Sequence, residues 1–296
     1  MRIARRLIER SGATGIAPWR LAGRVAMSEA RGKVPGLRSA AVTIDDRGTR
    51  MWADLSRPFG RSLYRYGFPE PEARLLPALL RPGDVFVDGG AHLGVFTLLA
   101  AALVGDSGRV VACEPVPENY QLLQANVALN GFRCVDSHMV ALSDRPGRTE
   151  LFSFGPGSAL GSFAPATLAG SRRLEVEVRT LDEVVGSLVE RVRLVKLDIE
   201  GAELLALKGA AALLRARPDF LLELEPAHLG RQGATVDDLE SLFAGTGYRG
   251  FNIDEDGSGI VLNPMESWRR PVGNPNILVS ARSAPLPART AGVKGD

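Results

Sequence analysis

An acid and closely spaced glycines interrupt two apolar runs in VFVDGGAHLGVFTLLAA, residues 85–101. Asp88 ends the first run, and Gly89 and Gly90 let the backbone turn tightly and approach a ligand, while Gly94 lets the following helix pack closely on the strand. The spacing differs from the G-x-G-x-x-G pattern of nicotinamide and flavin sites, and a carboxylate before the glycines would repel a pyrophosphate. The segment favours a ligand with positive charge and hydroxyl groups instead. S-adenosylmethionine has this chemistry, because it carries an ammonium, a sulfonium and a ribose but no phosphate.

A second acid, Glu114, follows Asp88 by 26 residues and comes directly after the apolar run RVVAC. One strand–helix–strand unit separates the two acids, so Glu114 is expected beside the glycine turn, where a carboxylate can accept both hydroxyl groups of a ribose. Sites for NAD place an acid in the same way, so Glu114 alone does not exclude an NAD(P)-dependent oxidoreductase. A surface acid before Pro115 is the structural alternative.

The segment VKLDIEGAE, residues 195–203, places Lys196 and Asp198 on one face of a predicted strand, because side chains alternate along a strand. A lysine in a central strand is costly unless it is paired. Glu223, in the neighbouring strand FLLELEP, could form that ion pair. If Lys196 is catalytic instead, burial would lower its pKa and let it take a proton from a substrate hydroxyl. Asp198 would then face the reacting groups.

Further acids follow these strands. Glu200 and Glu203 are expected at the start of the next helix, where the helix dipole favours negative charge. Oxygen and nitrogen ligands for Mg²⁺ could come from Asp198, Glu200, Glu203, Glu225 and His228. Their spacing does not require an ion, so we predict no metal site.

The composition is that of a globular protein. Of 296 residues, 45% are hydrophobic and 24% are charged, and the net charge of +2 does not indicate general binding of polyanions. Two cysteines support neither a disulfide framework nor a zinc site. The longest apolar stretch, Val95–Val104, is too short to span a bilayer, and no signal peptide is visible, so a cytoplasmic protein is expected.

The two ends of the chain are predicted to lie outside the main domain. Residues 1–70 have weak periodicity and a basic start, and we expect a loose extension with a few short elements. Its first ten residues, MRIARRLIER, could form an amphipathic helix in weak contact with a membrane surface or a polyanionic substrate. A solvated basic arm explains the same charges and is the interpretation that we favour. Residues 283–296 are predicted to be a disordered tail.

Predicted strands alternate with predicted helices between residues 71 and 282. This order is typical of a doubly wound α/β fold, in which helices cover both faces of a mostly parallel sheet. Asp256 and Gly257 separate two strand-like runs and predict a closing hairpin, so the far edge of the sheet is expected to be antiparallel. A ligand is expected beyond the C-terminal ends of the strands.

Five ordered motifs resemble the FkbM family of S-adenosylmethionine-dependent methyltransferases, over roughly residues 72–282: VFVDGGAHLGVFTLLAA, CEPVPENYQLLQANVALNG, VALSD, VKLDIEGAELLALKGA and FLLELEPAH. The resemblance implies the seven-stranded Rossmann-like methyltransferase fold and S-adenosylmethionine as cofactor. It also implies O-methylation of a hydroxyl on a sugar, glycolipid or polyketide-type acceptor, that is, a small molecule or glycan and no nucleic acid. An NAD(P)-dependent oxidoreductase and a non-catalytic S-adenosylmethionine-binding module remain the alternatives.

Carried over position by position, the resemblance assigns two sets of residues. The cofactor set runs from the methionine end through the ribose to the adenine: Asp88, Gly90, Ala91 and Gly94, then Glu114 with Asn119 bracing the turn after it, then Ser143 and Asp144. The reaction set is Lys196, Asp198 and Glu200. Gly89 stands where the family commonly has a branched residue. The segment before residue 70 matches the family poorly, so the acceptor itself is not identified.

Overall fold

The computed structural model describes residues 17–68, 70–153, 161–162, 172–256, 259–268, 275–282 and 290–291. The basic segment MRIARRLIER, for which we favour a solvated arm over an amphipathic helix, lies outside these ranges. Of the predicted tail, only Thr290 and Ala291 are described, and they form the short strand β15. Within the described ranges, no helix has the length and apolar character needed to cross a bilayer.

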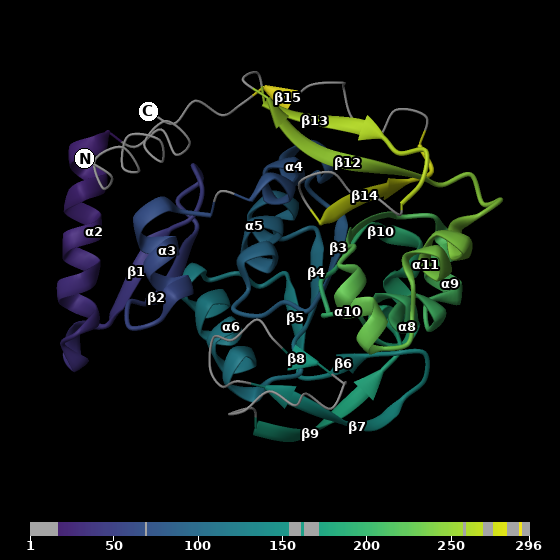
Figure 1. The fold of residues 1–296 in the computed structure, drawn as a ribbon, viewed down its shortest axis with the longest axis horizontal. Helices are drawn as coiled ribbons and strands as arrows, with labels where there is room; N and C mark the ends of the chain where they lie inside the picture. The colour runs from purple at the N-terminus through teal and green to yellow at the C-terminus, as the bar shows by residue number, and fades with distance from the viewer. Residues whose placement is uncertain are drawn as a thin grey trace.

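A nine-stranded sheet forms the centre of the described chain (Figure 1). Its strands, from one edge to the other, are β15 (Thr290–Ala291), β13 (Gly259–Pro264), β12 (Arg249–Asp256), β14 (Asn276–Ser280), β11 (Asp219–Glu223), β10 (Val192–Leu197), β3 (Val85–Gly89), β4 (Arg109–Cys113) and β5 (Val135–His138). The five strands from β11 to β5 pair in parallel, and β14, β12 and β13 pair antiparallel. The doubly wound sheet and its antiparallel closing edge are therefore confirmed. The sheet has two strands more than the seven predicted, because β13 and β15 extend its edge.

Helices cover both faces of this sheet, and the alternation of side chains divides the core. Phe86, Leu194 and Leu221 pack on one face with α4 (Pro71–Leu79) and α5 (Val95–Val104). Residues next to them in the same strands, such as Val87, Val195 and Leu222, pack on the other face. That face is covered by α7 (Leu181–Val185), η2 (Gly186–Arg191), α8 (Glu203–Lys208), α9 (Ala211–Ala216), α10 (Pro226–Arg231) and α11 (Val236–Phe243). Strands buried on both faces explain the continuous apolar runs of the sequence.

A second, smaller sheet follows β5 in the chain. It contains β6 (Ala141–Leu142), β9 (Arg172–Arg179), β7 (Gly147–Ser153) and β8 (Gly161–Ser162), in this order. The sequence VDSHMVALS, residues 135–143, has the composition of a single strand, but it is divided between β5 and β6, which belong to different sheets. This division moves the residues after Leu142 away from the central sheet.

The described part of the N-terminal segment is packed, which corrects the expectation of a loose extension. It consists of α2 (Pro18–Gly32), η1 (Pro35–Leu37), the hairpin strands β1 (Ser39–Thr43) and β2 (Arg50–Asp54), and α3 (Pro58–Tyr66). Met51, Leu55 and Leu63 are buried with Leu98 of α5. The side-chain amide of Asn126, in α6 (Pro117–Asn130), accepts a 2.8 Å hydrogen bond from the backbone N–H of Trp52. Short elements that each bury only a few side chains produce little periodicity in the sequence.

Candidate active site

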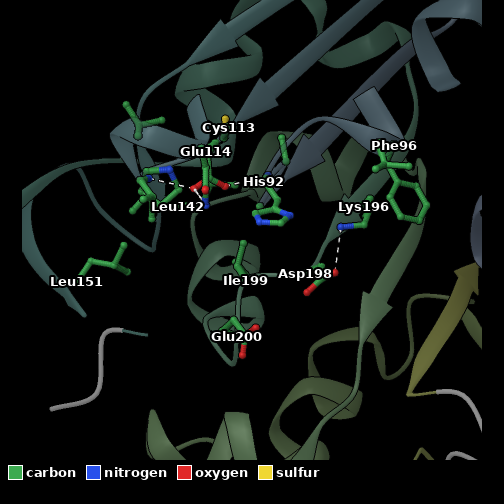
Figure 2. A pocket seen from close by; sticks show the side chains of 18 of the residues that line it. His92, Phe96, Cys113, Glu114, Leu142, Leu151, Lys196, Asp198, Ile199 and Glu200 are labelled. Atoms are coloured by element: carbon green, nitrogen blue, oxygen red, sulfur yellow. Dashed lines mark hydrogen bonds and ion pairs between the residues drawn. The ribbon is translucent and has the colours of Figure 1, made fainter. Parts of the chain in front are cut away.

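A pocket opens at the C-terminal ends of β3, β4 and β10 (Figure 2). The chain reverses its order of strands between β3 and β10, and such a switch point is where ligands bind in doubly wound sheets. The predicted residues divide between two sides of this pocket. The β4 side consists of Gly90, Ala91, Glu114 and Asn119, and the β10 side consists of Lys196, Asp198 and Glu200.

The glycine turn brings the ends of three strands into contact. The backbone N–H groups of Gly90 and Ala91 both donate to the carbonyl oxygen of Cys113, at 3.0 and 2.9 Å. Gly90 has a φ of 75°, and a Cβ at this position would lie 2.0 Å from the carbonyl oxygen of Asp198. Glycine is therefore required here for both conformation and space. Gly94 precedes α5 and packs against Leu123, and its predicted contact with a cofactor stays a prediction.

Glu114 lies immediately after β4 and borders the pocket, as its spacing from Asp88 predicts. Its carboxylate accepts hydrogen bonds from the backbone N–H groups of His92 (2.8 Å) and Val116 (3.0 Å) and from the side-chain amide of Asn119 (3.3 Å). Asn119 thus braces the turn in the predicted way. Burial raises the pKa of Glu114 to about 7, although these donors favour its charged form.

Asp88 lies beneath the pocket and does not border it in the described structure. One carboxylate oxygen accepts a 2.6 Å hydrogen bond from the hydroxyl of Thr97, and the other lies 3.9 Å from Nζ of Lys196. Burial raises the pKa of Asp88. Asp88 therefore acts on the pocket through Lys196, and its predicted contact with a cofactor remains a prediction.

Lys196 is paired with acids other than the predicted one. The register of the sheet places Asp88 beside Lys196 on β3 and Leu221 beside it on β11, so Glu223 is too far along its strand to be the partner. Nζ of Lys196 lies 3.3 Å from Asp198 and 4.8 Å from the ring centre of Phe96 (Figure 2). Burial lowers the pKa of Lys196, but Asp198 and Asp88 outweigh that effect and raise it overall. The lowered pKa that a lysine base would need is therefore not found, because two neighbouring carboxylates favour the ammonium, and the catalytic role of Lys196 stays a prediction.

Ser143 and Asp144 do not border the pocket in the described structure. The backbone N–H of Ser143 donates to the carbonyl oxygen of Arg179 at 3.1 Å, which holds the segment against β9, and Asp144 is exposed. Leu142 and Leu151 border the pocket in their place (Figure 2). This end of the pocket is therefore apolar.

Several pocket residues were missed in the sequence. Phe59, Phe68 and Glu70 border the pocket and come from the segment around residue 70, where no motif indicated a role. A further group lies next to Glu200: Glu223, at the end of β11, and His228, in α10, approach Glu200 closely. Glu200 and His228 were among the candidate metal ligands in the sequence, whereas Glu223 was noted only for its unusual position in an apolar strand.

Two of the acids considered as metal ligands bind the backbone instead. The carboxylate of Glu203 accepts from the N–H groups of Ile199 (2.9 Å) and Gly201 (3.4 Å). The carboxylate of Glu225 caps α10 by accepting from the N–H of Ala227 at 3.3 Å.

Comparisons with known proteins point to one family. A family model described as the methyltransferase FkbM domain matches residues 88–249, more than half of the chain. Methyltransferase 1 from Beauveria bassiana (strain ARSEF 2860) is 27% identical over 148 residues, and the match covers 43% of this chain and 59% of that protein. Methyltransferase sdnD from Sordaria araneosa is 29% identical over 159 residues, and the match covers 43% of this chain and 61% of that protein. The match thus spans about three fifths of each relative.

Solved structures provide a more distant likeness. TYW2 from M. jannaschii in complex with AdoMet has a TM-score of 0.43 and 13% sequence identity. The match covers 82% of this chain and 84% of that one.

Proposed function

Since this chain belongs to the FkbM methyltransferase domain family, we propose that it transfers a methyl group from S-adenosylmethionine to an oxygen atom of its acceptor. Membership of the family confirms the resemblance seen in the sequence motifs, together with the Rossmann-like methyltransferase fold. The cofactor, the acceptor class and the roles of individual residues belong to the proposal.

The position of Glu114 carries this proposal. Its carboxylate is fixed by three N–H donors at the end of β4, beside the turn of Gly90 and Ala91. A carboxylate held in this way is suited to accept the two hydroxyl groups of a ribose. The neighbouring apolar wall of Leu142 and Leu151 is suited to the flat face of an adenine. The turn itself leaves no room for side chains, so a ligand can approach the backbone.

The β10 side is suited to the acceptor. When bound, S-adenosylmethionine supplies a methyl group on a sulfonium, which is an electrophile for in-line displacement. Lys196 stays protonated and holds Asp198 in place, and Asp198 reaches the pocket. We assign to the carboxylate of Asp198 the proton that the acceptor hydroxyl loses as its oxygen–methyl bond forms. Glu200 lies beyond Asp198 on the same side.

The acceptor that fits this side is a molecule with a hydroxyl group and an apolar part. Phe59, Phe68 and Phe96 offer ring surfaces next to the acidic groups. Aromatic rings bind both apolar chains and the C–H faces of sugars, while acids bind hydroxyl groups. These features support a sugar, glycolipid or polyketide-type acceptor.

Calorimetry with S-adenosylmethionine, NAD⁺ and NADP⁺ tests the cofactor. We expect only S-adenosylmethionine to bind, and Glu114→Ala to weaken binding about 100-fold, because two hydrogen bonds to a charged group are lost. Asp106→Ala is the control, since Asp106 is an exposed acid that pairs with Arg133 and does not border the pocket, and it should keep the affinity. Binding of NAD⁺ with similar affinity, or an unchanged affinity of Glu114→Ala, would contradict the proposal.

A mass-spectrometric search tests the reaction. Cell extracts are incubated with the protein and with S-adenosylmethionine that carries a deuterated methyl group. We expect new products whose mass equals that of a hydroxyl-containing compound of the extract plus the labelled methyl group. Binding of the cofactor without any product across extract fractions would favour the non-catalytic module.

A further inference from the structure

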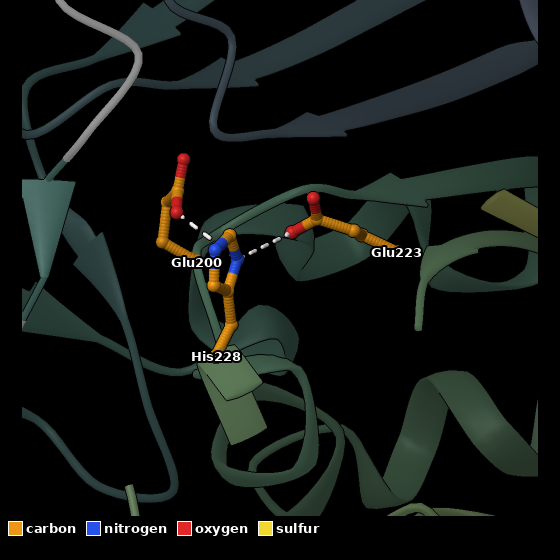
Figure 3. A group of neighbouring side chains, drawn as sticks. All are labelled: Glu200, Glu223 and His228. Carbon is orange, nitrogen blue, oxygen red and sulfur yellow. Dashed lines mark hydrogen bonds and ion pairs between the residues drawn. The ribbon is translucent and has the colours of Figure 1, made fainter. Parts of the chain in front are cut away.

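We propose that Glu200, Glu223 and His228 form a binding site for a divalent transition-metal ion at the wall of the pocket. One ligand atom of each residue lies within 4.8 Å of the other two. The residues come from separate places in the chain, namely the turn after β10, the end of β11 and α10. Figure 3 shows the imidazole of His228 between the two carboxylates. Binding of the ion does not depend on the proposed methyl transfer.

The two distances from His228 match those between neighbouring ligands of one ion, and the ligand atoms of the two carboxylates lie within 4.8 Å of each other. Nδ1 of His228 lies 3.1 Å from Oε2 of Glu200 and 3.3 Å from Oε2 of Glu223. Ligand atoms about 2.0–2.2 Å from an ion are separated from each other by about 3–3.6 Å. A small adjustment of the carboxylates would therefore place all three atoms around one ion.

Hydrogen bonding within the group is incomplete without an ion. A neutral imidazole can donate one proton from Nδ1, and that nitrogen is within hydrogen-bond distance of Glu223. Oε2 of Glu200 is then left without a hydrogen bond, although Glu200 is only 9% exposed. A buried carboxylate oxygen in this state is costly, and a cation would accept lone pairs from all three ligand atoms.

The electrostatics of the group also favour a cation. Burial and the charge of Asp198 raise the pKa of Glu200 to about 7, and the same two effects raise the pKa of Glu223. Two carboxylates and a further acid thus meet in a partly buried place, where Lys196 is already paired with Asp198 and the charge of Arg231 offsets part of the effect on Glu200. A divalent ion would offset this negative charge.

The backbone holds the ligands in place without using their carboxylates. Glu200 adopts a φ of 56°, and a Cβ at Gly201 would lie 2.2 Å from the carbonyl oxygen of His228. The turn after β10 is therefore in close contact with α10. Glu203 stabilises the turn and Glu225 caps the helix, so these two acids have structural partners. The three proposed ligands remain directed at one another.

The ligand set indicates the class of ion. Mg²⁺ and Ca²⁺ favour sets made only of oxygen atoms, whereas one imidazole with two carboxylates suits Zn²⁺, Mn²⁺, Fe²⁺ or Co²⁺. Three protein ligands leave coordination positions open for other molecules. Because Glu200 borders the pocket, an open position would face the acceptor, whose oxygen atom the ion could bind.

Titration of the metal-free protein with Co²⁺ and Mn²⁺ tests the site. We expect one ion per chain by calorimetry, and a ligand-field absorption band of Co²⁺ that shows direct coordination. Glu223→Gln and His228→Asn should each weaken binding at least tenfold. One matched control is Glu225→Gln, which keeps an oxygen that can cap α10. The other is His138→Asn, which changes a histidine that lies 3.4 Å from Asp136 in β5, the strand at the far edge of the sheet. Both controls should bind the ions like the unchanged protein.

Two outcomes would overturn the site. One is the absence of stoichiometric binding of either ion, which would mean that the three residues share protons instead. The other is equal loss of binding in the controls and in the ligand variants. The affinity for S-adenosylmethionine should be measured in parallel, with a chelator present to remove metal ions. The metal site can then fail while the cofactor still binds, and cofactor binding can fail while the metal site holds, so the two proposals are tested separately.

Discussion

On the β4 side of the pocket, the carboxylate of Glu114 is held by three N–H donors. On the β10 side, the carboxylates of Asp198 and Glu200 lie near other acids; Lys196 pairs with Asp198, and the charge of Arg231 acts on Glu200. The β4 side is therefore stabilised by groups without net charge, most of them in the backbone. The β10 side depends on a balance of charges.

This difference indicates how each side responds to ligand binding and to substitution. Backbone donors keep their positions when a ligand binds or leaves, so the β4 side is preorganised for one kind of ligand. A balance of buried charges is disturbed by the loss of any one member. Substitutions on the β10 side should therefore affect stability more than isosteric substitutions on the β4 side.

Substitution of Lys196 should cause the largest loss of stability. Lys196→Met leaves Asp88 and Asp198 without their cation, and removing one partner of a buried pair costs about 3–5 kcal/mol. We expect a loss of this size in the free energy of unfolding, measured with urea at neutral pH. Glu114→Gln keeps an oxygen for the same donors and should lose less than about 1.5 kcal/mol.

Two further variants show whether charge is the cause. Lys208→Met changes an exposed lysine at the end of α8 and should leave stability nearly unchanged. Asp88→Asn, added to Lys196→Met, removes one of the uncompensated charges and should recover part of the loss. If the double variant is less stable than Lys196→Met alone, the contrast between the two sides does not lie in charge.

Gly90 contacts both sides of the pocket, because its backbone N–H donates to Cys113 and its Cα lies against the backbone of Asp198. Its substitution should cause the next largest loss of stability. In Gly90→Ala, the new Cβ would meet the carbonyl oxygen of Asp198 at 2.0 Å, and the φ of 75° adds strain. The positive φ costs about 1–2 kcal/mol, and overpacking costs about 1–3 kcal/mol more. Urea unfolding should show the sum of the two.

Gly131→Ala separates these two costs. Gly131, at the end of α6, has a similar φ of 67°, but a Cβ there would meet nothing within 4 Å. It should lose only the 1–2 kcal/mol due to strain. Equal losses in the two variants would show that the contact between the β3 turn and Asp198 is not tight.

Much of the fold and of the β4 side could be predicted from the sequence. Strands buried on both faces appear as continuous apolar runs, and Asp88, Gly90 and Glu114 come at or just beyond the ends of such runs. Their proximity follows from the parallel order of the strands alone. Local patterns are sufficient where a site is built by consecutive strands.

The β10 side depends on information that the sequence does not show locally. The partner of Lys196 is decided by the register between β10 and β3, which no motif reveals. The approach of His228 to Glu200 depends on the packing of α10 against a glycine turn. The resemblance assigned Ser143 to the adenine end, and the sequence does not show that the chain leaves the central sheet after β5 and continues in the smaller sheet at β6.

The smallest predicted effect is a pH dependence that belongs to the β4 side. The pKa of Glu114 is raised to about 7 by burial, so its carboxyl group is mostly protonated at pH 6 and mostly charged at pH 8. A ligand whose ribose hydroxyls donate to the charged form should bind about tenfold more weakly at pH 6 than at pH 8. Methylthioadenosine is the suitable probe, because it has the ribose but no titrating amine.

Glu114→Gln identifies the group that causes this dependence. Its amide does not titrate, so its weaker affinity for methylthioadenosine should be the same at pH 6 and pH 8. If the variant keeps the tenfold change, the titrating group lies elsewhere, and the acids of the β10 side are the nearest source. In that case the balance of charges would extend across the whole pocket, and the two sides would differ less than their hydrogen bonds suggest.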